Sequence, residues 1–166
     1  MTEQLTDRAE FPKSPSIYKV AYWSLIPMIL VMPIWIALGR AFFGAGGWMF
    51  LVTLPLAAVI FFPYHILLVV LAFVNKKREL SEWAMLLLLT YYALAFTFQL
   101  SLVDGGDTKE SVGSVLTFIG LPELMNTIIF ALSFGGGFIV MITLVVVMSM
   151  DIARSKKNKP LSSSAK

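Results

Sequence analysis

A single histidine and two adjacent tyrosines are the side chains with the most chemistry in the long apolar stretches of this sequence. His65 is the only histidine, and imidazole is the side chain that changes protonation near neutral pH. Tyr91 and Tyr92 lie about as far along the next apolar stretch, counted from the turn between the two. Two antiparallel helices would bring them to the same depth. We therefore expect His65 to hydrogen-bond to Tyr91 or Tyr92.

Two hydroxyl side chains, Ser24 and Thr143, fall near the same depth in the first and fourth apolar stretches. They complete a predicted polar cluster with His65, Tyr91 and Tyr92. Inside a membrane, such a cluster can relay a proton or contact a ligand. The alternative, which the sequence favours, is a neutral histidine that holds two helices together, at about 0.6 kcal/mol for an average contact of this kind.

The elements that must position these residues are four stretches without a charged residue. They cover residues 20–38, 48–74, 83–102 and 124–150. About 20 residues of helix cross a hydrocarbon core about 30 Å thick, so each stretch is long enough. None alternates polar and apolar residues as a barrel strand would. The sequence predicts an all-α, polytopic membrane protein whose four transmembrane helices form an antiparallel bundle.

The composition indicates the same class of protein. Apolar residues make up 58% of the chain and charged residues 14%, whereas soluble domains average about 25% charged residues. The chain contains no cysteine, which excludes disulfides, zinc–thiolate sites and iron–sulfur clusters formed by its own residues. We expect no catalytic residues, no metal site and no cofactor.

Basic residues predict the orientation. In a four-span arrangement, all of the 13 lysines and arginines except Arg40 and Lys109 fall on one side. The positive-inside rule makes that side cytoplasmic, so both termini are expected there. Residues 1–19 would form a cytoplasmic segment, residues 20–150 the transmembrane domain, and residues 151–166 a basic cytoplasmic tail that is disordered toward its end. Cleavage of the first stretch as a signal peptide is an alternative, since residues 44–46 are small.

Two connections carry further expectations. Lys76, Lys77 and Arg78 lie in the short turn between the second and third stretches, where anionic lipid headgroups attract basic residues. The same residues can be pure topology determinants. The segment 111–121 is mildly apolar, and we leave open whether it is an interfacial helix or an ordinary loop.

Small and polar residues at helical spacing predict the surfaces through which the third and fourth helices pack. The predicted packing residues are Thr90, Ala93, Thr97, Ser101, Asn126, Ser133, Gly135 and Gly137. Alternatively, the three consecutive glycines at 135–137 break the fourth helix into two halves, as in some transporters. Four prolines in the first two stretches either line a flexible path or are repaired by neighbouring helices.

The absence of charged residues from all four stretches limits the possible functions. Ion-coupled carriers and pumps place ionisable groups at membrane depth. We therefore expect a non-enzymatic accessory, assembly or scaffold subunit of a membrane complex. The alternatives are a small facilitator-type transporter or lipid-translocating protein, and a membrane-embedded lipid-modifying enzyme. The expected partners are the bilayer, with anionic lipids on its cytoplasmic face, and another membrane protein or a second copy, but no nucleic acid. The short loops favour a bacterial-type plasma membrane.

Overall fold

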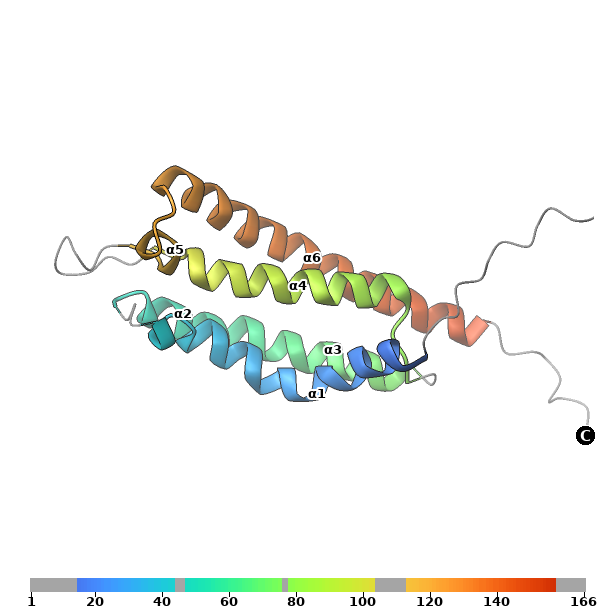
Figure 1. Cartoon of the computed structure of the whole chain (residues 1–166). Helices are drawn as coiled ribbons and strands as arrows, with labels where there is room; N and C mark the ends of the chain where they lie inside the picture. The colour runs from blue at the N-terminus through green and yellow to red at the C-terminus, as the bar shows by residue number, and fades with distance from the viewer. Residues whose placement is uncertain (1–14, 44–46, 76–77, 104–112, 158–166) are drawn as a thin grey trace, which may run out of the picture.

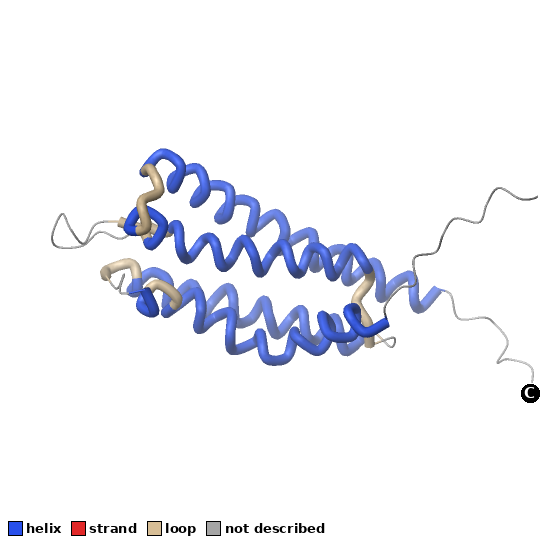
Figure 2. The backbone as a smooth tube through the Cα atoms, in the orientation of Figure 1, coloured by secondary structure: helices blue, strands red, loops and turns tan. Residues whose placement is uncertain are grey.

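The computed structural model of the chain describes residues 15–43, 47–75, 78–103 and 113–157. Helices make up nearly all of this part of the chain (Figure 2). Four of them are long and apolar enough to cross a membrane, and they cover Ile17–Leu38, Phe50–Val74, Glu82–Ser101 and Glu123–Lys156. The prediction of an all-α chain with four helices of membrane-spanning length is confirmed.

The helical elements follow one another with short connections. They are α1 (Pro15–Leu38), η1 (Ala41–Phe43), α2 (Phe50–Leu56), η2 (Ala57–Phe61), α3 (Phe62–Val74), α4 (Glu82–Ser101), α5 (Val115–Phe118) and α6 (Glu123–Lys157). The helices α1 and α6 are longer than the charge-free stretches 20–38 and 124–150. The helix α1 begins at Pro15 and α6 continues to Lys157. A charged residue ends an apolar stretch, but it does not end a helix.

The second predicted stretch forms three consecutive helical elements. The helix α2 passes into η2, a π-helical segment, which passes into α3. At the other end of the chain, α6 is continuous through Gly135, Gly136 and Gly137. The alternative of a helix broken at these glycines is therefore wrong.

The long helices lie side by side and define two ends of the molecule (Figure 1). At one end α1 begins, the α3–α4 turn lies, and α6 finishes; we call this the basic end, because Lys19, Arg78, Arg154 and Lys156 lie there. The opposite end holds α5, and we call it the α5 end. The helix α1 packs against α2, η2, α3 and α4, whereas α6 packs mainly on α4 and less extensively on α3 and α5.

The core lies where these helices meet. Its largest aliphatic side chains that are at most 1% exposed are Leu25, Ile36, Leu68, Leu88 and Leu144. The helices do not share this burial equally. Only 17% of the most apolar stretch of α6 is buried within the chain, against 39% for α1 and for α4. The helix α6 is therefore the least buried of the four long helices.

Local hydrogen bonds explain how two of the helices begin. The Ser81 hydroxyl accepts the Ala84 N–H at 3.2 Å and caps α4. Ser114 and Thr117 form a reciprocal capping box that starts α5, an arrangement that satisfies two otherwise unpaired donors. Because α5 is a single turn, from Val115 to Phe118, the described part of segment 111–121 is a structured connection with one helical turn and not a long interfacial helix.

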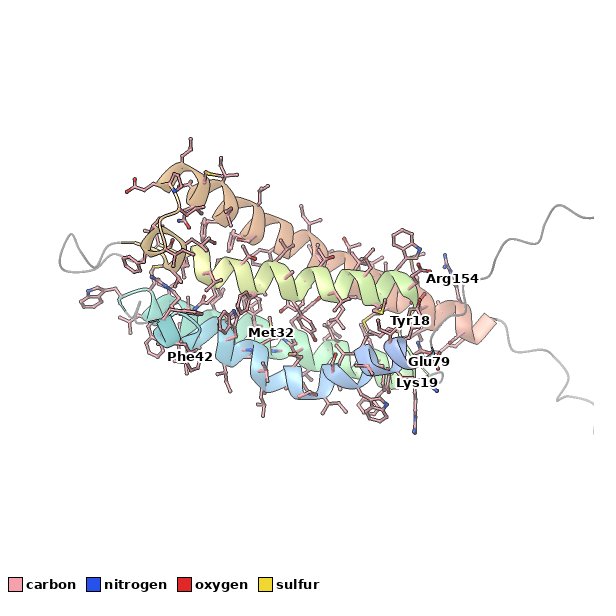
Figure 3. The ribbon with its side chains drawn as sticks, in the orientation of Figure 1. Tyr18, Lys19, Met32, Phe42, Glu79 and Arg154 are labelled. Atoms are coloured by element: carbon pink, nitrogen blue, oxygen red, sulfur yellow. The ribbon has the colours of Figure 1, made fainter. Side chains whose placement is uncertain are left out.

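Exposed aromatic side chains mark both ends of the helices. Phe42 and Trp48 lie near the α5 end, where they are 71% and 62% exposed, and Trp83 opens α4 at 69% exposed. Figure 3 shows Phe42 at the α5 end and Arg154 at the basic end. Tryptophan and other aromatic rings are enriched where a membrane meets water. The positions of these rings fit helices that begin and end at the two interfaces.

Candidate functional site

The π-helical segment η2 determines where the only histidine lies. It occupies Ala57–Phe61, between Pro55 and Pro63. Proline has no N–H to donate and its ring collides with the carbonyl four residues earlier. A wider π turn accommodates such a residue, and π-helical turns are frequent at functional sites. His65 follows two residues after Pro63.

His65 is fully buried at 0% exposure. Its Nδ1 donates a hydrogen bond to the Phe61 carbonyl, the last residue of η2, at 2.7 Å. Because a carbonyl oxygen only accepts, the neutral ring carries its proton on Nδ1 and keeps a lone pair on Nε2. Nε2 has no hydrogen-bond partner in the described part of the chain. The hydrogen bond that we expected from His65 to Tyr91 or Tyr92 is therefore not formed: Nδ1 bonds the Phe61 carbonyl, and neither tyrosine hydroxyl bonds Nε2.

The structure nevertheless places the histidine among tyrosine rings. The His65 ring centroid lies 5.5 Å from that of Tyr91, 6.4 Å from Tyr92 and 5.7 Å from Tyr64. We call these four residues the His65–tyrosine cluster. Tyr64 was not among the predicted residues, although it adjoins His65 in sequence. Its hydroxyl donates to the Met141 carbonyl of α6 at 3.1 Å, so the cluster joins α3, α4 and α6.

The other two predicted members of the polar cluster lie elsewhere. Thr143 is on the exposed side of α6, and its hydroxyl donates to the Ile139 carbonyl of the same helix at 2.8 Å. The Ser24 hydroxyl donates to the Ala21 carbonyl within α1, also at 2.8 Å. Both hydroxyls therefore donate to a carbonyl of their own helix and not to another helix. Serine and threonine in helices readily bond a carbonyl three or four residues earlier. The position of Ser24 and Thr143 along their helices did not predict which way their side chains point.

The tyrosine hydroxyls give a matched pair of substitutions. Replacing Tyr64 with phenylalanine removes the hydrogen bond from α3 to α6, and we expect a loss of about 0.6 kcal/mol, at most about 1.7, in the free energy of unfolding. Tyr92→Phe is the control, because the Tyr92 hydroxyl has no partner among the described residues; we expect no loss. Thermal unfolding in detergent compares the two. Equal losses would contradict the assigned role of Tyr64.

A second polar network ties α5 to the neighbouring helices. Asn126, at the start of α6, donates to the Ser101 carbonyl at 3.0 Å and accepts from the Ser114 hydroxyl at 2.8 Å. All three residues are at most 1% exposed. Arg40, 5% exposed, donates from Nη2 to the Gly113 carbonyl at 3.2 Å. The network explains how a four-residue helix is held against the larger ones.

Gly39 allows α1 and α4 to approach each other beside this network. A Cβ atom at Gly39 would lie 2.9 Å from Gln99 Cγ and 2.6 Å from the Trp35 carbonyl oxygen. The Trp35 ring stacks on Phe96, with centroids 4.4 Å apart and planes 7° apart. At this contact, the Trp35 ring packs on Phe96 of α4, and Gly39, which has no side chain, leaves room for Gln99 of α4.

The predicted packing stripe of α4 mostly faces outward. Thr90 and Ala93 are exposed and Thr97 is half-buried, whereas Ser101 is buried. The buried positions of α4 are Ala84, Leu88, Tyr91, Ala95, Phe98, Gln99 and Ser101. Within the described part of the chain, only the Ser101 end of this stripe is buried, so the packing role predicted for Thr90, Ala93 and Thr97 stays a prediction.

On α6 the predicted packing residues divide into two groups. Asn126 and Ser133 are buried against the rest of the chain. A Cβ atom at Gly135 or at Gly137 would meet nothing within 4 Å. The described part of this chain therefore does not require glycine at these two positions.

A narrow cavity of about 20 Å³ lies between η2, α4 and α6. Its walls include Phe61, Tyr91, Phe98, Ser133, Gly137 and Phe138. We call it the Tyr91 cavity, after the buried tyrosine that lines it. A cavity of this size holds about one water-sized group. It is too small for a sugar, an amino acid or a lipid headgroup.

The basic end carries the residues expected to meet lipid headgroups. Arg78 is exposed, whereas Lys76 and Lys77 lie outside the described residues. Lys19 Nζ and Glu79 Oε1 are 3.5 Å apart, which joins the start of α1 to the α3–α4 turn (Figure 3). Exposed Arg154 lies on the part of α6 that extends beyond its apolar stretch.

Comparison of the chain with protein-family models, with curated proteins and with solved structures found no match in any of the three.

Proposed function

We propose that the protein is a membrane-embedded, non-enzymatic accessory or scaffold subunit that holds another membrane protein along α6. The observation that carries this proposal is the uncovered surface of α6, of whose most apolar stretch only 17% is buried within the chain. Lipid can cover such a surface, so exposure alone does not indicate a partner. The residues on the surface supply the further support.

The composition of the uncovered face favours a helix as its neighbour. Ala131 and Gly135 are exposed four residues apart on the same side of α6, the spacing through which membrane helices approach closely. Glycine inside a helix costs about 1 kcal/mol relative to alanine. Gly135 serves no packing purpose within the described chain, since a Cβ atom there would meet nothing within 4 Å. A close neighbour outside the chain accounts for this glycine.

The facilitator alternative has less support. It draws on the prolines and the π-helical segment beside His65. A path for a solute, however, needs polar groups and room along the helices. The Tyr91 cavity, at about 20 Å³, has room for a single water-sized group. His65 bonds the end of its own π-helical segment, which favours a structural role for this residue.

The proposal includes an orientation and a location. We place the basic end in the cytoplasm, where Lys19, Arg78, Arg154 and Lys156 would face anionic lipid headgroups. The α6 helix has 35 residues and is therefore about 50 Å long, longer than the hydrocarbon core of about 30 Å. Its last two turns would extend into the cytoplasm. We place the protein in a bacterial-type plasma membrane.

Purification of the tagged full chain in mild detergent tests the proposed function. We expect a membrane protein to copurify in a fixed ratio, and the double variant Ala131→Leu, Gly135→Leu to lose it, because leucine side chains keep two helices apart. Ala93→Leu is the matched control: it enlarges an exposed small residue of α4 and should leave the complex intact. A chain that purifies without a stoichiometric partner, or a complex that survives the α6 double variant, would overturn the proposal.

A further inference from the structure

We propose that a pocket at the basic end binds the primary ammonium group of a phospholipid headgroup, as in phosphatidylethanolamine. The pocket lies where α3 ends and α4 begins, against α6, and has a volume of about 10 Å³. Its walls include Asn75, Ser81, Ala84, Met148 and Asp151. We call it the Asp151 pocket. The inference goes beyond the proposed function, because it does not depend on a partner along α6.

Asp151 gives the pocket its charge. It lies three residues after Met148 on α6, and residues at this spacing are neighbours on a helix surface. Met148 is 5% exposed and Ile152 is 8% exposed, so this face of α6 points into the bundle, and Asp151 is half-buried. No hydrogen bond or ion pair joins Asp151 to another residue that the structure describes. A carboxylate withdrawn from water without a partner costs free energy, so the pocket favours a cationic group.

The size and the lining of the pocket favour a primary ammonium group. About 10 Å³ holds about one water-sized group, which matches an ammonium group, whereas the trimethylammonium group of phosphatidylcholine is larger than this space. An ammonium group donates three hydrogen bonds. Three side chains of the wall bring oxygen acceptors: the Asp151 carboxylate, the Asn75 amide and the Ser81 hydroxyl. The Ser81 oxygen already accepts the Ala84 N–H at 3.2 Å, and a hydroxyl oxygen has a second lone pair.

The position of the pocket matches the depth of a lipid headgroup. The charge-free stretches 48–74 and 124–150 end directly before Asn75 and Asp151. Trp83, next to Ala84, is 69% exposed, as expected of an aromatic ring at the interface.

Arg154 supplies a contact for the phosphate of the same headgroup. It is exposed at the basic end and lies three residues after Asp151 on α6 (Figure 3), so the two residues are neighbours on the helix surface. A guanidinium group binds phosphate through two parallel hydrogen bonds. A headgroup whose ammonium group enters the Asp151 pocket would present its phosphate to Arg154.

Native mass spectrometry of the full-length protein in a nonionic detergent tests the inference on the wild-type chain. The protein is mixed with equal amounts of phosphatidylethanolamine, its N-monomethyl form and phosphatidylcholine, all with the same acyl chains. We expect phosphatidylethanolamine to bind about tenfold more tightly than phosphatidylcholine, the factor that one hydrogen bond to a charged group produces. The monomethyl form, which has one N–H fewer, should lie between the two.

Two variants locate the preference. Asp151→Asn keeps the shape of the side chain and removes its charge, so the two lipids should bind equally. Glu82→Gln is the matched control, because it removes a negative charge from an exposed residue of the same end that does not line the pocket; the tenfold ratio should persist. Arg154→Gln should weaken the binding of both lipids and keep their ratio, since both carry the phosphate.

Three results would overturn the inference. Equal binding of phosphatidylethanolamine and phosphatidylcholine to the wild-type protein would show that the pocket takes no ammonium group. A tenfold ratio that persists in Asp151→Asn would place the contact elsewhere. Loss of the ratio when sodium replaces a bulky organic cation at constant ionic strength would show that the pocket holds a metal ion. None of these measurements involves a copurifying protein, so this inference and the proposed function can fail separately.

Discussion

Replacing Gly39 with alanine is expected to lower the free energy of unfolding by about 1–3 kcal/mol, the range for an added methyl group in a packed interior. The new Cβ atom would lie 2.6 Å from the Trp35 carbonyl oxygen and 2.9 Å from Gln99 Cγ. The first of these neighbours is backbone, which cannot rotate away. Trp35 lies four residues before Gly39 in the same segment, so the backbone at the end of α1 must distort to relieve this contact. Gln99 belongs to α4, so its side chain must also move away from Gly39. Thermal unfolding of the purified chain in detergent measures the change.

Gly135→Ala is the control for Gly39→Ala. A Cβ atom at Gly135 meets nothing within 4 Å, and alanine favours a helix over glycine by about 1 kcal/mol. The isolated chain should therefore be as stable as the wild type or slightly more stable. If both glycine variants lost stability equally, the close approach of α1 and α4 at Gly39 would be contradicted.

Replacing Asn126 with leucine should have the second large effect. The change removes the donor to the Ser101 carbonyl and the acceptor of the Ser114 hydroxyl, both in buried positions. A buried polar group that loses its partner costs about 1–3 kcal/mol. We expect a loss of that size in the free energy of unfolding. Because Ser114 also caps α5, proteolysis within residues 113–122 should become faster before the helices unfold.

Thr127→Val provides the comparison for Asn126→Leu. Thr127 is the next residue of α6, it is exposed, and its hydroxyl donates to the Glu123 carbonyl of its own helix. We expect a change below about 0.5 kcal/mol, as for most surface substitutions. The assignment of Asn126 as the residue that holds α5 in place would be wrong if its variant were as stable as Thr127→Val.

The four long helices were predictable because two independent features of the sequence and of the membrane indicate them. Each stretch is apolar over about 20 residues or more, and a backbone in hydrocarbon must bond within its own helix. Helix ends were less predictable. Nothing after Met150 breaks a helix, so α6 continues through Asp151 and Arg154 to Lys157, although the apolar stretch has ended. Hydropathy predicts where a membrane can be crossed, and caps and turns decide where a helix stops.

The side chains of the candidate site were predictable only in part. His65, Tyr91 and Tyr92 do lie together, because all three fall at similar depth on adjacent antiparallel helices. The depth argument could not show that His65 would bond the Phe61 carbonyl four residues earlier, since depth says nothing of bonds that a side chain makes to its own helix. It also could not show that Thr143 faces outward, which depends on the rotation of α6 about its own axis.

The polar residues at the α5 end were harder to predict from the sequence than the His65–tyrosine cluster. Arg40 is one of only two basic residues on its side of the chain, and an isolated charge beside an apolar stretch indicates a specific contact. Gln99 is fully buried and was visible as the most polar residue of its stretch. Ser114 carried no signal, because its roles as cap and as donor to Asn126 arise only when a segment distant in sequence folds beside it.

The central claim is that four helices cross the membrane with the basic end in the cytoplasm. Because the chain contains no cysteine, single introduced cysteines and a membrane-impermeant maleimide test it without background. We expect Glu123→Cys, at the α5 end, to react in intact cells, and Glu82→Cys, at the basic end, to react only after permeabilisation. Ile66→Cys, which faces outward midway along the second span, should stay unlabelled in both conditions. Labelling of Glu82→Cys in intact cells, or of Ile66→Cys in either condition, would contradict the account.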